Sequence, residues 1–338
     1  MEWSRRKFIN TGIAGSLGVF SISAGIKWPG GTRKLPGGFW PVMMTPFNKD
    51  LSIDYAGLKE LISWYEAAGA QGLFANCASS EMYQLSPKER IDLTQFVVKH
   101  SNVPVVSTGT FTDDVEENVG FIKKIHDTGV DAVVIIPSVI VGKEKDDAAM
   151  MNHFGELISK TSDIPLGIYE CPSPYRRLIE PEKLKQLTRS DRFLYFKDTS
   201  CDELLVEEKI KVSVKSSLGI YNAHSPDVLH SIRHGGAGIS CIAGNFYPEL
   251  FSYLWKEGRT ETVSPSVKKV NDFVLANDRV IGKKYSVAAK YFMQIRGLPV
   301  TVASRRSTQT LDAADKDRLD LLWNELQDLG ESLNIEIV

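Results

Sequence analysis

Eight short apolar runs recur along the middle of the chain, and stretches with helical spacing separate them. The runs cover residues 39–44, 72–76, 104–109, 132–136, 165–169, 193–197, 217–221 and 238–242. Each run is mainly apolar and shows no strict alternation of apolar and polar residues, which is typical of strands in a parallel sheet that is buried on both faces.

The segments between these runs have the start signals of helices. Residues 54–68 carry one apolar stripe at helical spacing, and the segment from Ser86 opens with Ser-Pro-Lys-Glu, a capping box with proline at the first helical position. Similar stretches begin at Asp113 and Ser225. Eight strand–helix units in series favour a closed (β/α)₈ TIM barrel over an open doubly wound sheet.

The strand pattern stops after about Gly258, and only helical patterns follow. These cover residues 263–276, 283–296 and 311–333. The chain therefore divides into a barrel over residues 35–258 and a C-terminal helical extension over residues 259–338. In a barrel of this kind the active site lies on the loops that follow the strands.

The first 34 residues have the layout of an export signal rather than of a folded element. Arg5 and Arg6 precede an uncharged stretch, residues 11–26, which is rich in Gly, Ser and Ala. The paired arginines resemble the bacterial twin-arginine motif. The stretch is shorter than the about 20 apolar residues of a membrane span, so we expect a periplasmic or otherwise exported protein without a stable membrane anchor. The alternatives are an amphipathic helix and an uncleaved anchor.

Composition and charge exclude several classes of protein. The 338 residues are 43% hydrophobic and 24% charged, as in ordinary globular proteins. The net charge is −2, and lysine and arginine cluster only at the start of the chain, so no nucleic-acid partner is expected. The four cysteines form no C-x-x-C pair, so no metal site is predicted, and their three full disulfide pairings stay open. They are Cys77, Cys171, Cys201 and Cys241.

Four motifs lie at the ends of predicted strands, three at or after the ends of strands two, five and six and one at the start of strand eight. They are Asn76-Cys77-Ala78-Ser79-Ser80-Glu81 with Leu85-Ser86 and Glu89-Arg90 behind it, Tyr169-Glu170-Cys171-Pro172, Phe196-Lys197-Asp198-Thr199, and Gly235-Gly236-Ala237-Gly238-Ile239-Ser240. Together they resemble the GTTGE-x-x-x-L-S-x-x-E-R, Tyr-Asn-Val-Pro, lysine and glycine-pair segments of the dihydrodipicolinate synthase/N-acetylneuraminate lyase family. The resemblance extends from about residue 38 to residue 258, and the helical extension fits it.

The resemblance implies class I aldolase chemistry without a cofactor. Lys197 would form a Schiff base with the keto group of pyruvate or a related 2-keto acid. A lysine that faces inward among apolar side chains loses its proton more easily, which such a nucleophile requires. The alternative is a lysine exposed at the end of a strand. The resemblance also implies a homotetramer.

The first motif departs from the family pattern. The family binds the substrate carboxylate with the hydroxyls and backbone N–H groups of GTTGE, where this chain has Ala78, Ser79 and Ser80. One hydroxyl and the backbone donors would remain for the carboxylate, while Glu81 would brace the loop. The family's proton-relay tyrosine is absent, because Ser138 follows Pro137.

Several other side chains are candidates for the site. Strand alternation puts Tyr195 on the same inward face as Lys197, so its hydroxyl would serve the Schiff base unless it is a core aromatic. Glu170, Arg176 and His224 would lie on the rim and select the substrate, and Ser240 would contribute from the last strand. Arg176 is alternatively a solvated basic residue, and His224 a capping residue.

These observations favour a lyase or aldolase that acts on a 2-keto acid, and we expect a sugar acid or a sialic-acid-like compound as the type of substrate. Two alternatives stay open. One is a hydratase or dehydratase that uses the same imine. The other is a binding protein on the same barrel, in which catalysis has lapsed with the missing tyrosine.

Overall fold

The computed structural model describes residues 34–338, and residues 4–26, which carry the predicted export signal, lie outside this part. None of the helices within residues 34–338 is both long enough and apolar enough to cross a bilayer.

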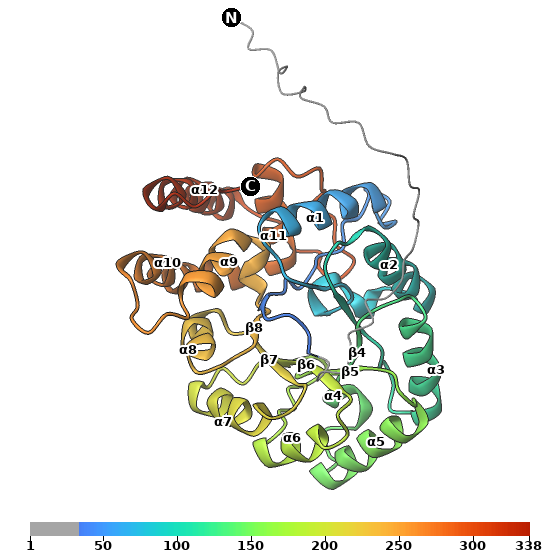
Figure 1. Cartoon of the computed structure of the whole chain (residues 1–338). Coiled ribbons are helices and arrows are strands. Elements are labelled where there is room, and N and C mark those ends of the chain that lie inside the picture. Colours follow the sequence, from blue (N-terminus) through green and yellow to red (C-terminus); the bar gives the residue numbers. More distant parts are fainter. Residues whose placement is uncertain (1–33) are drawn as a thin grey trace, which may run out of the picture. The chain divides into compact units, whose positions relative to one another are not determined.

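Eight parallel strands form one sheet that curls into a barrel (Figure 1). They are β1 (Gly38–Phe39), β2 (Leu73–Phe74), β3 (Val105–Thr108), β4 (Ala132–Ile135), β5 (Leu166–Tyr169), β6 (Phe193–Asp198), β7 (Gly219–Asn222) and β8 (Gly238–Ile239). Each strand pairs with the next in sequence from β2 to β8, and β8 pairs with β1. A parallel bridge between Val42, just after β1, and Phe74 of β2 closes the ring. The predicted (β/α)₈ barrel is therefore confirmed.

Helices cover the outside of the barrel. They are α1 (Tyr55–Ala67), α2 (Pro87–His100), α3 (Val115–His126), α4 (Pro137–Ile140), α5 (Asp147–Lys160), α6 (Pro181–Thr188), α7 (Glu203–Ser213), α8 (Val228–Arg233) and α9 (Pro248–Glu257). The Ser86 hydroxyl accepts a hydrogen bond from the Glu89 N–H at 3.2 Å, and the Glu89 carboxylate accepts one from the Ser86 N–H at 2.8 Å. This is the capping box that the sequence predicts for the start of α2.

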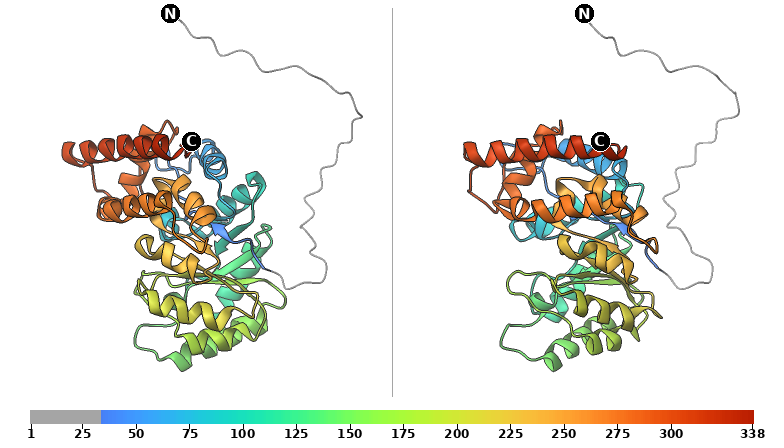
Figure 2. Two further views of the ribbon diagram at one scale, coloured as in Figure 1. Left: turned by 60° about the vertical axis from the view of Figure 1, so that its left-hand side comes forward. Right: turned by 90° about the vertical axis from the view of Figure 1, so that its left-hand side faces the viewer.

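The C-terminal extension consists of α10 (Pro265–Gly282), α11 (Tyr285–Ile295) and α12 (Ala313–Leu333). These helices stack at one side of the barrel, next to α1 and α9 (Figure 2). Buried Lys290 of α11 pairs with buried Glu81, in the loop after β2, at 2.8 Å. Arg296 at the end of α11 pairs with Glu249 of α9. The extension is thus attached to the barrel by buried charges as well as by apolar packing.

The two faces of the sheet bury separate sets of side chains. Residues that alternate along the strands fill the barrel interior: Trp40, Val42, Phe74, Val106, Val134, Tyr169, Tyr195 and Tyr221. Their neighbours in sequence, such as Ile168 and Phe196, belong to the larger cluster that packs under the helices. In a strand, successive side chains point to opposite faces, so this division shows which residues face the interior.

Candidate active site

Lys197 lies near the end of β6 and is only 3% exposed. Its Nζ lies 4.3 Å from the ring centroid of Tyr169 and 5.9 Å from that of Phe74. Among residues 34–338, no carboxylate pairs with this amine and no acceptor receives a hydrogen bond from it. Burial lowers the pKa of Lys197 below its ordinary value, although three nearby thiols act against this shift. The amine is thus held in surroundings that favour its neutral, nucleophilic form.

The loop after β2 presents hydrogen-bond donors at its start. Ala78–Ser80 form a single 3₁₀ turn, and the backbone N–H groups of Ala78 and Ser79 have no acceptor within the described part of the chain. The Ser79 side chain is buried, and its Oγ accepts a hydrogen bond from the hydroxyl of Tyr285 at 2.9 Å. Two N–H groups and one hydroxyl proton at this turn therefore have no acceptor within residues 34–338, and carboxylate binding by Ala78 and Ser79 stays a prediction.

Ser80, in contrast, is committed to the loop itself. Its Oγ accepts from the Cys77 N–H at 3.0 Å and lies 2.7 Å from the Ala75 carbonyl oxygen. Its backbone N–H donates to the Cys77 carbonyl at 3.0 Å. The expectation that Ser80 binds substrate is therefore corrected, because both of its donors already have protein partners.

Glu81 braces this loop, as expected. Its carboxylate accepts hydrogen bonds from Lys290 Nζ at 2.8 Å, from Ser304 Oγ at 3.0 Å, and from the backbone N–H groups of Arg305 and Arg306 at 2.7 and 2.8 Å. These donors all belong to the C-terminal extension. The extension therefore fixes the loop that carries Ser79.

Tyr285, at the start of α11, is a site residue that the sequence does not reveal. Asn245, in the loop after β8, donates a hydrogen bond from its Nδ2 to the Tyr285 hydroxyl. The hydroxyl in turn donates to Ser79, which is 206 positions away in the chain. No local motif marks a contact between residues so far apart in sequence.

Tyr195 and Ser240 face each other across the barrel interior. The Tyr195 hydroxyl donates to Ser240 Oγ at 2.7 Å, and Ser240 donates to the Trp40 carbonyl at 2.9 Å. The Tyr195 ring stacks on Tyr221 with a centroid separation of 4.5 Å. Both protons are thus committed within the interior, and this placement favours the alternative in which Tyr195 is a core aromatic.

A cavity of about 590 Å³ opens on the loops after β2, β3, β4 and β5. Its lining includes Tyr83, Phe111, Ser138, Val139, Ser173 and Tyr175. The Tyr83 hydroxyl lies 3.9 Å from Cys171 Sγ, and Ser138 donates to the Cys171 carbonyl at 3.3 Å. The Cys171 thiol in turn is close enough to act on the charge of Lys197. Cys171 therefore contacts two residues of the cavity lining and also lies near the amine, at the carboxyl ends of the strands.

The comparison with known proteins agrees with this arrangement. The model of the dihydrodipicolinate synthetase family matches residues 35–325, which is most of the chain. The protein belongs to this family. A 4-hydroxy-tetrahydrodipicolinate synthase of Methanosarcina mazei is 27% identical over 215 residues, which are 64% of this chain and 72% of that protein.

Several solved structures have the same fold. One is YagE, a prophage protein of the dihydrodipicolinic acid synthase family from E. coli K12, which was solved in complex with pyruvate. It superposes with a TM-score of 0.76 and is 21% identical, and the match covers 86% of this chain and 98% of the YagE chain. The 2-keto 3-deoxygluconate aldolase of Picrophilus torridus gives a TM-score of 0.72 at 22% identity, over 81% of this chain and 98% of its own. This dihydrodipicolinate synthetase family protein is thus similar in sequence to a synthase and similar in fold to an aldolase.

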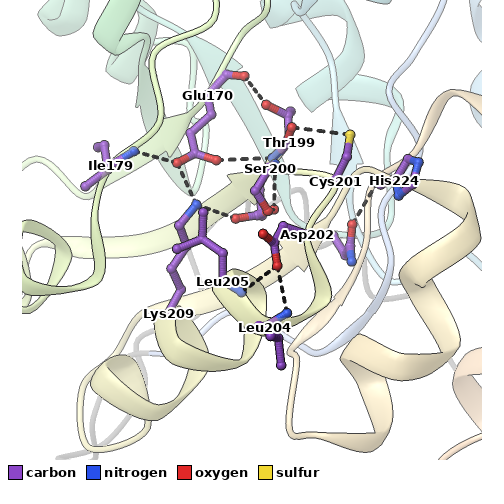
Figure 3. Close-up of polar contacts among 12 residues, drawn as sticks. Glu170, Ile179, Thr199, Ser200, Cys201, Asp202, Leu204, Leu205, Lys209 and His224 are labelled. Atoms are coloured by element: carbon purple, nitrogen blue, oxygen red, sulfur yellow. Dashed lines mark hydrogen bonds and ion pairs between the residues drawn. The ribbon is translucent and has the colours of Figure 1, made fainter.

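Glu170 lies outside the barrel interior in this family member. It follows Tyr169 and therefore points to the opposite face, where it is fully buried (Figure 3). Its carboxylate lies 2.8 Å from Lys209 Nζ of α7 and accepts from the backbone N–H groups of Ile179 and Thr199 at 2.7 and 3.1 Å. The prediction that Glu170 selects substrate is corrected by this placement, because all of its contacts are structural.

Lys209 lies between two carboxylates in this cluster. Its Nζ is 2.6 Å from Asp198 Oδ2 and 2.8 Å from Glu170 Oε1. Burial raises the pKa of Glu170 to about 7, with the negative charge of Asp198 adding to the effect and Lys209 opposing it. The two carboxylates raise the pKa of Lys209 in spite of its burial. Lys209 therefore stays charged, and Glu170 is the member of the cluster that takes up a proton near neutral pH.

Arg176 and His224 lie on the rim near each other. Arg176 Nη1 is 3.9 Å from Cys201 Sγ, and Cys201 is close enough to Asp227, the partner of His224, to be affected by its charge. His224 Nδ1 is 2.6 Å from Asp227 Oδ2, and the histidine side chain is 31% exposed. Both residues are accessible, as specificity residues must be.

All four cysteines, including Cys201, are free thiols.

Proposed function

We propose that this protein is a class I lyase or aldolase that forms a Schiff base between Lys197 and the keto group of a 2-keto acid. The observation that carries the proposal is the buried Lys197 amine at the carboxyl end of β6, which has no charged partner in the described residues. An amine with a lowered pKa is the nucleophile that imine formation needs.

The substrate carboxylate would occupy the loop after β2. The backbone N–H groups of Ala78 and Ser79 and the Ser79 hydroxyl supply three donors there. The guanidinium of Arg306, whose Nη1 lies 3.4 Å from the Ala78 carbonyl oxygen, adds positive charge beside the turn. Hydrogen bonds to a carboxylate are stronger than those between neutral groups, so this subsite would favour keto acids over neutral ketones.

The chemistry follows from the imine. The neutral amine adds to the keto carbon, and loss of one water molecule with uptake of one proton gives an iminium ion on Lys197. In cleavage, the hydroxyl on the second carbon from the iminium carbon loses its proton, the bond between that carbon and the first one breaks, an aldehyde leaves, and the iminium takes up the electron pair as an enamine. In condensation, loss of a proton from the first carbon gives the same enamine, which then attacks an aldehyde. A sugar acid or a sialic-acid-like acid as the longer substrate is supported by the aldolase among the structural neighbours.

Borohydride trapping tests the proposal. Incubation of the full chain with pyruvate and borohydride should reduce the imine to a stable secondary amine, with one pyruvate-derived adduct on Lys197 in peptide mass spectra. Lys197→Ala should carry no adduct, whereas Lys88→Ala, at an exposed lysine, should be labelled like the wild type. Wild-type protein that stays unlabelled with pyruvate and with longer 2-keto acids would exclude the proposal.

A binding protein is the second candidate, and Ser138 is the observation that favours it. At the position of the family's relay tyrosine this chain places a short hydroxyl that donates to the Cys171 carbonyl. An adduct on Lys197 without turnover of any sugar acid, together with stabilisation by the ligand, would indicate that function. Loss of water without C–C cleavage would instead indicate the hydratase or dehydratase.

Export and assembly are parts of the same proposal. We propose that the arginine pair Arg5–Arg6 directs export and that the mature protein is a homotetramer. Cell fractionation of the wild type and of Arg5→Lys/Arg6→Lys tests the first statement, because the variant should stay in the cytoplasm. Light scattering of the purified chain tests the second.

A further inference from the structure

The Ser79 hydroxyl belongs to a chain of side-chain hydrogen bonds whose direction is fixed from one end. Asn245 is fully buried, and its Nδ2 donates to the Val42 carbonyl oxygen at 3.0 Å. A carbonyl oxygen only accepts, so the amide of Asn245 must turn its NH₂ group toward Val42. The Asn245 Oδ1 then faces the Tyr65 hydroxyl, which donates to it.

This orientation determines what Tyr285 does. The second N–H of the Asn245 amide points at the Tyr285 oxygen, which therefore accepts. The Tyr285 proton is then directed to Ser79 Oγ, 2.9 Å away. Since Ser79 accepts this bond, its own proton is left to donate, and within residues 34–338 it has no acceptor.

We infer that Tyr285 is a positioning residue for substrate specificity, which commits the Ser79 hydroxyl to donating a hydrogen bond to the carboxylate of a 2-keto acid. The inference rests on the proposed Schiff-base function and adds a residue from the C-terminal extension to its carboxylate subsite. Without Tyr285, the Ser79 hydroxyl could turn either its proton or its oxygen lone pairs toward the ligand. The proton would bind a carboxylate, whereas the lone pairs would repel it.

A comparison of two ketones tests this inference. Pyruvate and the neutral pyruvamide both offer a keto group to Lys197, but only pyruvate offers a carboxylate. The concentration that gives half-maximal borohydride labelling is measured for each in the wild type, Tyr285→Phe, Ser79→Ala and the double variant. Tyr285→Phe should lower the preference for pyruvate over pyruvamide about tenfold, as expected for a lost hydrogen bond to a charged group. The double variant should match Ser79→Ala, because Tyr285 acts through Ser79.

Tyr291→Phe is the matched control. Tyr291 lies on the same helix, and its hydroxyl lies 3.1 Å from Asp320 Oδ1 at the surface, so its removal should leave the preference unchanged. An equal loss of labelling by both ketones in Tyr285→Phe would show a purely structural role and overturn the inference. A wild type that neither ketone labels would instead mean that the proposed function itself fails.

A second, independent feature lies on the outer surface between α7 and α8. His230 of α8 and His234, the residue that follows α8, stand one turn apart and face Glu207 of α7. His230 Nε2 is 2.8 Å and His234 Nε2 is 3.7 Å from Glu207 Oε1, and the three ligand atoms lie within 4.8 Å of one another.

The ring of His234 has a partner of the kind found behind metal ligands. His234 Nδ1 lies 2.8 Å from the His230 carbonyl oxygen, which only accepts, so Nδ1 donates and Nε2 is the nitrogen directed toward Glu207. His230 Nδ1 lies 3.6 Å from the carboxylate of Glu203. The geometry points to a site for a divalent transition metal, with His230, His234 and Glu207 as ligands. The metal ion would replace the hydrogen bond between His230 Nε2 and the Glu207 carboxylate. Zn²⁺ suits two imidazoles and one carboxylate, with water as a fourth ligand.

Calorimetric titration of the full chain with Zn²⁺ tests this site. The wild type should show one saturable site that His234→Gln weakens at least tenfold, and the exposure of His234 makes the variant safe for folding. His100→Gln, at the end of α2, is the control and should bind like the wild type. Zn²⁺ binding that is unchanged in His230→Gln/His234→Gln would overturn the assignment.

Discussion

The amine of Lys197 lies 4.3 Å from the centre of the Tyr169 ring, on the neighbouring strand of the barrel. The face of an aromatic ring attracts a cation, but it offers no charge to balance one that is buried. The Tyr169 ring therefore interacts favourably with the protonated amine but does not offset the cost of burying its charge. Four predictions concern this amine and the buried charges behind it.

The rate of imine formation with pyruvate should rise with pH and level off below pH 10.5, the ordinary pKa of lysine. The reason is that only the neutral amine attacks, and burial lowers the pKa of Lys197. Initial rates of borohydride labelling between pH 6 and 11 measure this profile. A midpoint at or above the ordinary value would contradict the desolvation argument.

Lys197→Met should abolish labelling and stabilise the protein by about 0.5–2 kcal/mol at neutral pH, as replacements at strained functional positions commonly do. Because the folded state lowers the pKa of this amine, keeping it charged below that pKa costs folding free energy. The gain should shrink as the pH rises toward the ordinary value, where the amine is neutral in both states. Urea unfolding at several pH values measures the difference, and a destabilised Lys197→Met would be the contrary result.

Lys209→Met should destabilise the protein by about 3–5 kcal/mol, because it leaves the carboxylates of Glu170 and Asp198 buried without a cation. Chemical denaturation at pH 7 gives the free energy of unfolding. Lys88→Met is the control, since it breaks a pair with Asp92 in which the lysine side chain is 83% exposed, and it should change little. Equal effects of the two variants would show that burial of the cluster does not matter.

The protonation of Glu170 should be visible in the pH dependence of stability. Its pKa is raised from 4.5 to about 7 in the folded state, so the folded chain holds a proton that the unfolded chain releases. The free energy of unfolding should therefore fall as the pH rises from about 4.5 to 7. Glu170→Gln should flatten this part of the curve relative to the wild type, whereas Glu182→Gln, at an exposed position, should not. Parallel curves for wild type and Glu170→Gln would contradict the assignment.

The fold was predictable because its main signal is local. Apolar runs of five or six residues and capping signals such as that of Ser86 identify the strand–helix units, and the number of these units limits the architecture. The paired strands are shorter than the apolar runs, as with β2, which covers Leu73–Phe74. The apolar residues continue beyond the paired part of each strand, because the barrel interior and the surrounding helices also bury the residues on either side of that part.

The candidate site was predictable only in part. Successive side chains of a strand point to opposite faces, so Glu170 points away from the interior because Tyr169 faces inward. The motif Tyr169-Glu170-Cys171-Pro172 therefore contributes only some of its residues to the rim. Ser79 and Ser80 are neighbours in one 3₁₀ turn, and a shift of one position exchanges the hydroxyl that faces outward with the one that bonds to the loop. Tyr285 had no signal at all, because helix packing alone brings it to Ser79.

The position of α11 in the chain has a consequence for biosynthesis. Domains fold as they emerge during synthesis, and every strand of the barrel leaves the ribosome before α11 does. A nascent or truncated chain that ends after residue 258 would contain Lys197 but no Tyr285 to orient the proton of Ser79. Under our proposal, such a product would carry the reactive amine without the preference for carboxylates. Selectivity would therefore arise only with the last helices, as a property of the completed polypeptide.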